Sequence, residues 1–387
     1  MMFSTWQMPL TTAQRSKAMD IEIAPGKRAR QAYSFDDIAI VPSRRTRTPE
    51  DVSTSWQIDA YKFDLPLLAA PMDSVVSPET AIAIGKLGGL GVLNLEGLWT
   101  RYDDPRIPLG EIASMPDKHA TRRMQEIYNA PIRPELIKER IKQIRDAGVT
   151  VAASLSPQRT AELHKAVIDA GVDIFVIRGT TVSAEHVAAE NEALNLKKFI
   201  YELDVPVIVG GVATASGALH LMRAGAAGVL VGFGGGAAHT TRTVLGIEVP
   251  MASAVSEVAA ARREYLDESG GRYVHVIADG SIGRSGDIAK AIACGADAVM
   301  MGSALAKAVE SPGLGWHWGS EAYHPELPRG QRVNVGTVGT LEEVLIGPSH
   351  TSDGSMNLFG ALRRAMATCG FSEVKSFQRV DVVIHGR

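Results

Sequence analysis

The chain has 387 residues, of which 45% are hydrophobic, with a formal net charge of −3 and a sequence pI near 6.4. A chain of this length and composition can bury a large core, and the lack of any long run of like charge argues against a nucleic-acid partner or a membrane-surface patch. No stretch approaches the roughly 18 consecutive apolar residues of a membrane span. With only two cysteines and no secretion signal, we expect a cytoplasmic protein.

Residues 1–25 are assigned to a flexible N-terminal tail, in which an ordered pattern is first recognisable near Met19. Residues 26–387 are assigned to a single domain. Along this domain one pattern recurs: a helix-like stretch ends in a small residue and glycine, and an apolar β-branched run follows. Glycine permits the left-handed turn that ends a helix, and a short loop then enters a buried strand. The pattern occurs at residues 86–94, 146–154, 169–177, 223–231 and 294–302.

Three further apolar runs, at residues 65–71, 205–211 and 273–280, bring the predicted strands to eight, with helix-like segments between most of them. Eight βα units that close on themselves form a TIM barrel. An open, doubly wound sheet is the alternative, but no run carries a strong edge-strand signal. We therefore expect an α/β fold, a TIM (β/α)8 barrel.

Two segments lie outside this repeat. Residues 95–133 join the second strand to the next helix, and a post-barrel flap and C-terminal segment occupy about 307–387. Long ordered excursions on a barrel rim are usually lids or oligomer contacts. The final RVDVVIHG, at 379–386, is typical of a short strand or a tail.

The most specific stretch is ADGSIGRSGDIAKAIACGADAVMMGSALA at 278–306. Asp279 follows a buried strand, Gly280 and Ser281 offer backbone N–H groups, and Gly302 and Ser303 follow the last strand. Barrels commonly bind phosphate with the loops after their seventh and eighth strands. The alternative is that these glycines serve tight turns only.

This stretch closely resembles the phosphate-binding segment of IMP dehydrogenase and GMP reductase. Further segments resemble the same family: SFDDIAIVPSRRT at 34–46, APMDSV at 70–75, GGLGVL at 88–93 and GFGGGAAHTTR at 232–242. The 95–133 connection is too short for the CBS pair of the family, so we expect no CBS domain. NLEGLWTRYDDP at 94–105 and GWHWG at 315–319 are similar to the CBS-less IMP dehydrogenase-related paralogues of bacteria.

The resemblance implies redox chemistry at the purine C2 carbon of IMP or GMP, with NAD or NADP(H) as cofactor, in a homo-oligomer (tetramer or octamer). In IMP dehydrogenase a cysteine thiolate adds to C2, hydride leaves to NAD, and water hydrolyses the adduct. GMP reductase, in which ammonia leaves and NADPH supplies the hydride, is an alternative.

The resemblance also implies roles for individual residues. Asp279 would hold the ribose, Ser281, Gly302 and Ser303 the phosphate, and Met72 the base, and the substrate-binding set is Met72, Gly236, Asp279, Gly280, Ser281, Gly302, Ser303, Trp318 and Gly319. Thr241 would be catalytic, helping to activate water or ammonia. The backbone carbonyls of Gly234, Gly236 and His239 would bind a monovalent cation such as K⁺.

The main departure from the family is His239, which stands where the relatives have the cysteine nucleophile. Imidazole lacks the polarizability and thiolate chemistry of cysteine. Cys294 and Cys369 are interpreted as structural residues. We therefore assign His239 and Thr241 as the catalytic residues of a weakened oxidoreductase, or alternatively expect a non-catalytic IMP/GMP-binding regulatory paralogue.

Other departures affect the ligand loops. Ala70 and Ala237 replace serines, Gly211 replaces an asparagine of many relatives, and RGTT at 178–181 replaces an Asp-containing strand end that meets the nicotinamide ribose in the family. These changes weaken the dinucleotide side more than the phosphate side. Glu326 is the nearest candidate for the flap glutamate, and its alternative is a solvated loop charge.

Overall fold

The predicted TIM barrel is confirmed. In the computed structural model, which describes residues 20–186, 194–233 and 235–385, eight parallel strands pair in the closed order β10-β11-β12-β13-β6-β7-β8-β9. Each strand coincides with one of the eight predicted runs, and β8, β9 and β10 extend one residue past theirs: β6 (Leu67–Ala69), β7 (Leu90–Asn94), β8 (Ala152–Leu155), β9 (Ile174–Arg178), β10 (Val207–Val212), β11 (Gly228–Val231), β12 (His275–Asp279) and β13 (Ala298–Met301).

The barrel closes where its last strand pairs with its first. Val299, Met300 and Met301 of β13 lie opposite Leu67, Leu68 and Ala69 of β6. All three residues of β6 are fully buried. Such strands are covered by helices on one side and by the packed barrel interior on the other, which explains why they are continuous apolar runs without alternation.

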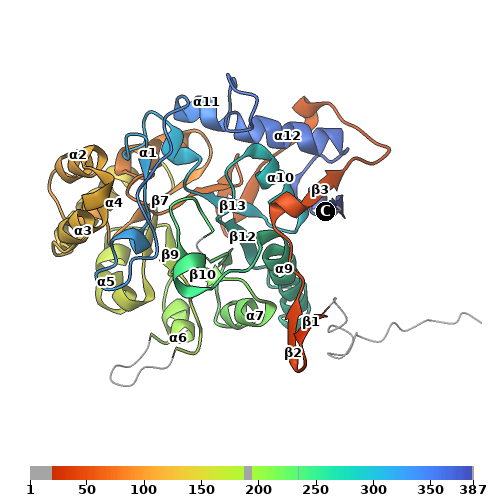
Figure 1. The fold of residues 1–387 in the computed structure, drawn as a ribbon, viewed down its shortest axis with the longest axis horizontal. Helices are drawn as coiled ribbons and strands as arrows, with labels where there is room; N and C mark the ends of the chain where they lie inside the picture. The colour runs from red at the N-terminus through yellow and green to blue at the C-terminus, as the bar shows by residue number, and fades with distance from the viewer. Residues whose placement is uncertain (1–19, 187–193, 234, 386–387) are drawn as a thin grey trace, which may run out of the picture.

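Helices surround the barrel on its outer side (Figure 1). They are α1 (Pro78–Lys86), α4 (Pro134–Asp146), α5 (Pro157–Asp169), α6 (Leu196–Tyr201), α7 (Ala215–Arg223), α9 (Met251–Glu268) and α10 (Ser285–Ala293), with the short α8 (Thr241–Leu245) before α9. Gly171 and Gly295, which follow α5 and α10, have φ angles of 85° and 110°. These left-handed turns are the ones that the recurring sequence pattern predicts.

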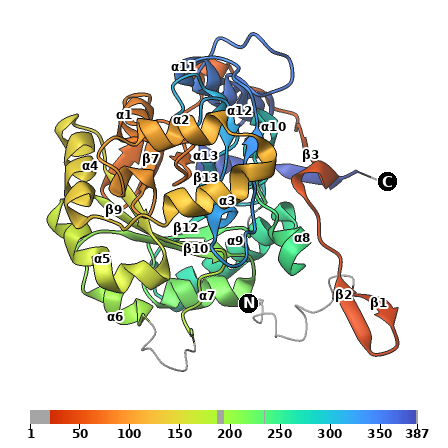
Figure 2. The same ribbon diagram turned by 60° about the vertical axis from the view of Figure 1, so that its left-hand side comes forward.

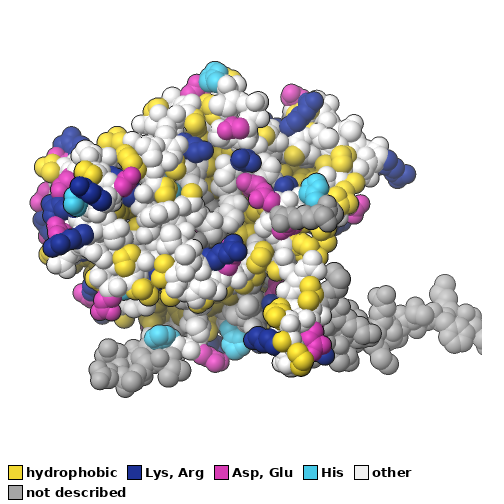
Figure 3. Space-filling view, in the orientation of Figure 1, with side chains coloured by type: hydrophobic (Ala, Val, Ile, Leu, Met, Phe, Trp, Pro, Cys, Tyr) yellow, Lys and Arg dark blue, Asp and Glu magenta, His cyan; other side chains and the backbone are white. Residues whose placement is uncertain are grey.

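The connection at 95–133 forms two helices, α2 (Arg106–Ser114) and α3 (Asp117–Tyr128), after a 3-10 turn. Charged side chains gather over this side of the molecule (Figure 3), and Arg123 forms exposed ion pairs with Glu111 and Glu126. The ring of Tyr128 stacks on Tyr323 with 3.4 Å between centroids. The connection is therefore a helical pair that packs against the post-barrel segment.

The post-barrel segment contains one small sheet, three α-helices and a final strand that pairs with the N-terminal part of the chain. β14 (Trp316–His317) pairs with β15 (Val333–Asn334), and α11 (Leu341–Leu345), α12 (Leu358–Thr368) and α13 (Val374–Phe377) follow. The predicted C-terminal strand is present as β16 (Asp381–Ile384), antiparallel to β3 (Ile38–Val41). A hairpin of β4 (Trp56–Ile58) and β5 (Tyr61–Phe63) lies against β12, since the Trp56 ring contacts His275.

An N-terminal hairpin of β1 (Asp20–Ala24) and β2 (Lys27–Arg30) projects from the barrel (Figures 1 and 2). Residues 20–25, which the sequence places in the flexible tail, thus form β1 and its turn, while residues 1–19 lie outside the described ranges. Ile21 and Ile23 are largely exposed. Across the residues that the structure describes, no helix combines the length and apolarity needed to cross a membrane.

A buried ion pair lies between α9 and the start of β13. Asp297 accepts hydrogen bonds from Arg262 Nη1 at 2.6 Å, Tyr273 Oη at 2.6 Å and Val276 N at 2.9 Å. Burial alone would raise the pKa of Asp297, but the charges of Arg262 and Lys375 lower it overall. The carboxylate therefore stays ionised and joins α9, β12 and β13.

We expect Asp297→Asn to lower the free energy of unfolding by about 3 kcal/mol, because it leaves the Arg262 guanidinium buried without its counter-charge. Urea denaturation at neutral pH measures the change. Glu162→Gln, which removes the exposed partner of Arg159, is the matched control and should cost less than about 1 kcal/mol. Equal losses in the two variants would contradict this role for the buried pair.

Candidate functional site

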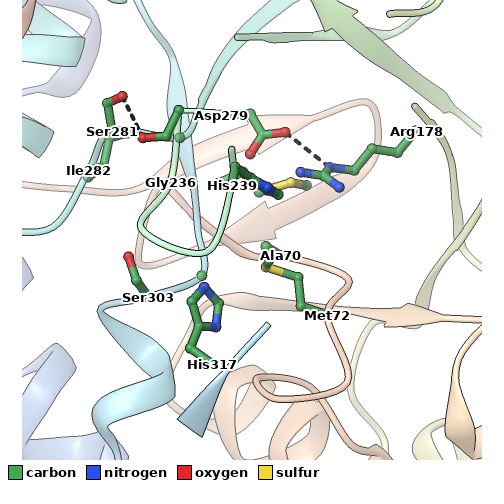
Figure 4. A pocket seen from close by; sticks show the side chains of 14 residues that line it. Ala70, Met72, Arg178, Gly236, His239, Asp279, Ser281, Ile282, Ser303 and His317 are labelled. Carbon is green, nitrogen blue, oxygen red and sulfur yellow. Dashed lines mark hydrogen bonds and ion pairs between the residues drawn. The ribbon is translucent and has the colours of Figure 1, made fainter. Parts of the chain in front are cut away.

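The carboxyl ends of the barrel strands meet around a pocket, here called pocket A (Figure 4). Its lining comes from five strand ends and from β14: Ala70, Met72, Arg178, Gly235, Gly236, His239, Asp279, Gly280, Ser281, Ile282, Met300, Gly302, Ser303 and His317. Barrel enzymes hold their catalytic groups at this rim. Pocket A is therefore the first candidate for a ligand site.

The two loops predicted to bind phosphate lie on one side of pocket A. Ser281 adopts a left-handed conformation with φ 56°, which is uncommon for a residue with a side chain, and its Oγ donates a hydrogen bond to the Gly235 carbonyl at 3.0 Å. A Cβ added at Gly302 would lie 2.9 Å from Met72 Sδ. The third phosphate residue, Ser303, lines the same pocket. These contacts bring the loops after β11, β12 and β13 together with the first barrel loop.

His239 lies in pocket A on the loop after β11. This loop pairs with the flap, since Thr240 N donates to the Arg329 carbonyl at 2.9 Å and Gln331 N to the Ala238 carbonyl at 2.8 Å. Burial lowers the pKa of His239, and the acidic groups of Glu321 and Asp279 oppose this only in part. The imidazole is therefore neutral near pH 7. Its Nδ1 is buried without a hydrogen-bond partner among the described residues.

An ion pair crosses the pocket from the end of β9 to the end of β12. Arg178 Nε lies 3.1 Å from Asp279 Oδ2, and both side chains are largely buried. In Figure 4 the guanidinium points toward Asp279 and His239. The residue that the resemblance places on the ribose is thus held in orientation by an arginine that sequence analysis did not assign to the site.

Glu321 is a further carboxylate close to Arg178 and His239, and the sequence did not indicate it. Its Oε1 accepts a hydrogen bond from Thr180 Oγ1 at 3.2 Å. Burial alone would raise the pKa of Glu321, but the Arg178 charge, together with His239 and the hydrogen bonds of the carboxylate, lowers it overall. A Cβ added at Gly319 would lie 3.0 Å from His239 Cε1 and 3.6 Å from Glu321 Oε2. The candidate Glu326 is exposed and lines neither this pocket nor pocket B, defined below.

His317 is a second histidine that the sequence did not indicate. Its Nδ1 lies 3.0 Å from Ser74 Oγ, which donates to the Trp318 carbonyl at 3.1 Å and accepts from Trp318 N at 3.2 Å. All three contacts are hydrogen bonds when Nδ1 carries the proton, because a hydroxyl has one hydrogen to donate. Burial lowers the pKa of His317 to about 3, so the ring is neutral.

A second pocket, pocket B, adjoins pocket A and shares Arg178 with it. Its lining is Pro71, Asn94, Glu96, Arg101, Ser154, Leu155, Ser156, Pro157, Gln158, Arg178, Gly179, Thr180, Thr181, Ser320, Glu321, Tyr323, His324, Pro325 and Arg329. The lining includes the RGTT segment that replaces the strand end of the family. Pocket B therefore provides room for a second ligand beside the first.

The structure brings most of the predicted site residues together. Those that line pocket A are Met72, Gly236, His239, Asp279, Gly280, Ser281, Gly302 and Ser303. Three others do not line it. Thr241 is buried at the start of α8, and its hydroxyl has no hydrogen-bond partner within the described ranges. Gly319 packs against Met72 and His239, and the Trp318 indole donates to Tyr128 Oη. Cys294 and Cys369 line neither pocket.

The predicted cation position is described only in part. Gly234 lies outside the described residues, and the Gly236 carbonyl accepts a hydrogen bond from His239 N at 3.0 Å. Among the described side chains no group of three His, Cys, Asp or Glu is arranged to hold a metal ion. A monovalent cation on the carbonyls of Gly234, Gly236 and His239 stays a prediction.

A closed barrel with a polar pocket at the carboxyl ends of its strands is the architecture of a TIM-barrel enzyme. Comparison with known proteins narrows this class. The family model described as IMP dehydrogenase / GMP reductase domain matches residues 32–325, so the chain belongs to the IMP dehydrogenase/GMP reductase family of oxidoreductases.

Individual relatives agree with this assignment. An uncharacterized oxidoreductase of Mycolicibacterium smegmatis is 52% identical over 372 residues, covering 94% of this chain and 99% of the relative. The inosine-5′-monophosphate dehydrogenase of Methanocaldococcus jannaschii is 26% identical over 468 residues, covering 90% and 92%. The crystal structure of an IMP dehydrogenase/GMP reductase-like protein from Corynebacterium glutamicum matches with a TM-score of 0.90 and 51% identity, covering 95% and 98%.

Below pocket A, Asp73 joins the first barrel loop to the 95–133 connection. It accepts hydrogen bonds from Tyr128 Oη at 2.7 Å and Leu98 N at 2.9 Å. Burial nevertheless raises the pKa of Asp73 to about 6. The folded protein thus binds a proton here at pH values where the unfolded chain has released it.

Because the folded-state pKa is raised, this proton stabilises the fold at low pH, and the stabilisation is lost as the pH rises toward and through about 6. We expect the free energy of unfolding to fall by roughly 2–3 kcal/mol from this group between pH 4 and 7. Asp73→Asn should flatten that part of the profile. Denaturant titrations at several pH values measure it, and parallel profiles for the two proteins would contradict the assignment.

Proposed function

We propose that the protein is a purine nucleotide oxidoreductase of the IMP dehydrogenase-related type, which binds IMP or GMP in pocket A and carries out NAD(P)-linked redox at the purine C2 carbon. The observation that carries the proposal is the meeting of Ser281, Gly302 and Ser303, Asp279 and His239 in one pocket. Phosphate, ribose and base partners thereby lie within one ligand site.

In this proposal each part of the nucleotide has a partner. The phosphate lies on the loops of Ser281, Gly302 and Ser303, the ribose hydroxyls donate to Asp279, and the base packs against Met72. Arg178, which pairs with Asp279 at 3.1 Å, holds that carboxylate in position for the ribose. Glycine at 302 permits the close approach of Met72, since a side chain there would overlap its sulfur.

His239 replaces the covalent chemistry of a thiolate with acid–base chemistry. A neutral imidazole can accept a proton, and the imidazolium that forms is stabilised by the nearby Glu321 and Asp279 carboxylates. Pocket B, beside His239 and Arg178, offers hydroxyl, guanidinium and backbone groups to a dinucleotide. When bound, NAD or NADP(H) would accept or supply the hydride. We expect slow turnover, because no cysteine lines pocket A.

A second candidate function is nucleotide binding without turnover, as in a regulatory paralogue. The observation that favours it is the combination of an intact phosphate side with a changed cofactor side, where Arg178 stands in the RGTT segment. Absorbance at the nicotinamide band, followed with IMP plus NAD and then with GMP plus NADPH, separates IMP dehydrogenase activity, GMP reductase activity and the absence of both.

Homo-oligomer formation, as a tetramer or octamer, is part of the proposal and is supported by the exposed Ile21 and Ile23 of the projecting hairpin.

Asp279→Ala should weaken IMP and GMP binding by at least about tenfold, because a charge-assisted hydrogen bond contributes roughly 1.5–3 kcal/mol. Isothermal titration calorimetry measures both affinities. Asp287→Ala is the control, since that carboxylate caps the start of α10 through Gly283 N and Arg284 N and does not line the pocket. Unchanged affinity in Asp279→Ala would refute its role in ribose binding.

His239→Cys should gain turnover and become sensitive to an electrophilic IMP analogue that leaves the parent protein unmodified. The reason is that a thiolate can add to C2, and losing such a nucleophile can cost several orders of magnitude when the other groups act with it. Mass spectrometry of the adduct and steady-state rates provide the readouts. A parent that is faster than the variant would show that the chemistry has been rebuilt around histidine.

A further inference from the structure

The junction between pockets A and B contains an arginine with unused donors. Within the described part of the chain, the Arg178 side chain donates one hydrogen bond, from Nε to Asp279. Its two Nη groups form no hydrogen bond with the described residues, and the side chain, which is 14% exposed, lines both pockets. A guanidinium carries five N–H donors, so the Nη groups at the pocket wall are free to donate to an acceptor in the pocket. A ligand at this junction would supply the missing acceptors.

Arg329 presents a second set of unused donors to pocket B. Its Nη2 donates to Thr180 Oγ1 at 3.0 Å, while its Nε is buried without a partner. No carboxylate among the described residues lies within ion-pair distance of Arg329. Thr180 follows Arg178 by two residues and lines pocket B with both arginines. The two guanidinium groups thus border the same pocket.

The acidic side chains of pocket B do not satisfy these donors. Glu321 accepts from Thr180 Oγ1 at 3.2 Å and from Ser320 Oγ at 3.1 Å, and Glu96 accepts from the backbone N of Ser156. Neither forms an ion pair with Arg178 or Arg329. The hydrogen bonds at the junction therefore leave guanidinium N–H groups of Arg178 and Arg329 without acceptors among the described residues. Carboxylate or phosphate oxygens match a guanidinium fork best.

We propose that the junction of pockets A and B is an oxyanion site, in which Arg178 and Arg329 bind a carboxylate or phosphate group carried by the second ligand. The inference rests on the proposed function in taking pocket A as the nucleotide site. The phosphate of a dinucleotide and the carboxylate of a small acid share this chemistry. Thr180, whose Oγ1 accepts a hydrogen bond from Arg329 Nη2, is a positioning residue for that guanidinium.

The test uses Ser303→Asp protein, in which the added carboxylate repels anions from pocket A and leaves the junction as the measured site. Inorganic phosphate, succinate and NADH are titrated separately by calorimetry. We expect Arg329→Gln in this background to weaken binding of at least one of these probes by at least tenfold. Arg159→Gln, which changes an exposed arginine on α5, is the matched control and should leave all three affinities unchanged.

The probes distinguish the sources of the oxyanion. Loss of succinate and phosphate binding identifies a small anionic ligand, and loss of NADH binding alone identifies the dinucleotide phosphates. Equal affinity of all three probes for Arg329→Gln and its parent, or no binding to either, would overturn the proposal. Arg329→Lys, which keeps the charge, should bind with intermediate affinity and guards against misfolding of the glutamine variant.

The proposed function is tested separately by titrating IMP into protein with Ser303 intact. IMP binding that survives Arg329→Gln, together with lost anion binding at the junction, supports both proposals. Absence of IMP binding with a working oxyanion site would refute the nucleotide assignment of pocket A alone. Unchanged probe affinities with normal IMP binding would refute the oxyanion site alone.

Discussion

The pairing of β13 with β6 is the constraint on which the site depends. Three residue pairs, from Val299 opposite Leu67 to Met301 opposite Ala69, close the barrel between its last and first strands. Because parallel strands end at the same rim, this closure brings the loop of Met72 against that of Gly302, although the two are far apart in the sequence. Without it, the loops of Ser281 and Gly302 and the Met72 side chain would not share a pocket.

Electrostatics then determine what this pocket can do. Arg178 interacts with three titratable neighbours. It pairs with Asp279, helps to lower the pKa of Glu321, and contributes to the lowered pKa of His239. The result is an arginine-paired Asp279 in the same pocket as a neutral imidazole. This arrangement suits nucleotide binding with proton transfer, and it differs from a site built around a thiolate.

The barrel was predictable because its signal is local. Five helix ends with glycine, each followed by an apolar run, indicate βα units, as at Gly171 and Gly295. Three further apolar runs bring the strands to eight, which leaves few alternative folds. Asp279, Ser281 and Ser303 were predictable because they directly follow strands within a specific motif. Chain order alone places such residues on the rim.

Residues whose roles depend on distant partners were not predictable in this way. Glu321 gains its significance from Thr180 and Arg178, which precede it by more than 140 residues. The sequence indicated Glu326 instead, and that residue is exposed. Trp318 was expected to touch the nucleotide, yet its indole is engaged by Tyr128. Only the folded structure shows that the neighbouring His317, and not Trp318, lines pocket A.

The central claim is that pocket A is a purine nucleotide site with His239 beside the base. A crystal structure of the protein with IMP tests it most directly. The account predicts phosphate density on the loops of Ser281 and Ser303, ribose hydroxyls on Asp279, and the purine against Met72 with its C2 edge toward His239. Density for IMP at another place, or its absence from pocket A at saturating concentration, would contradict the account.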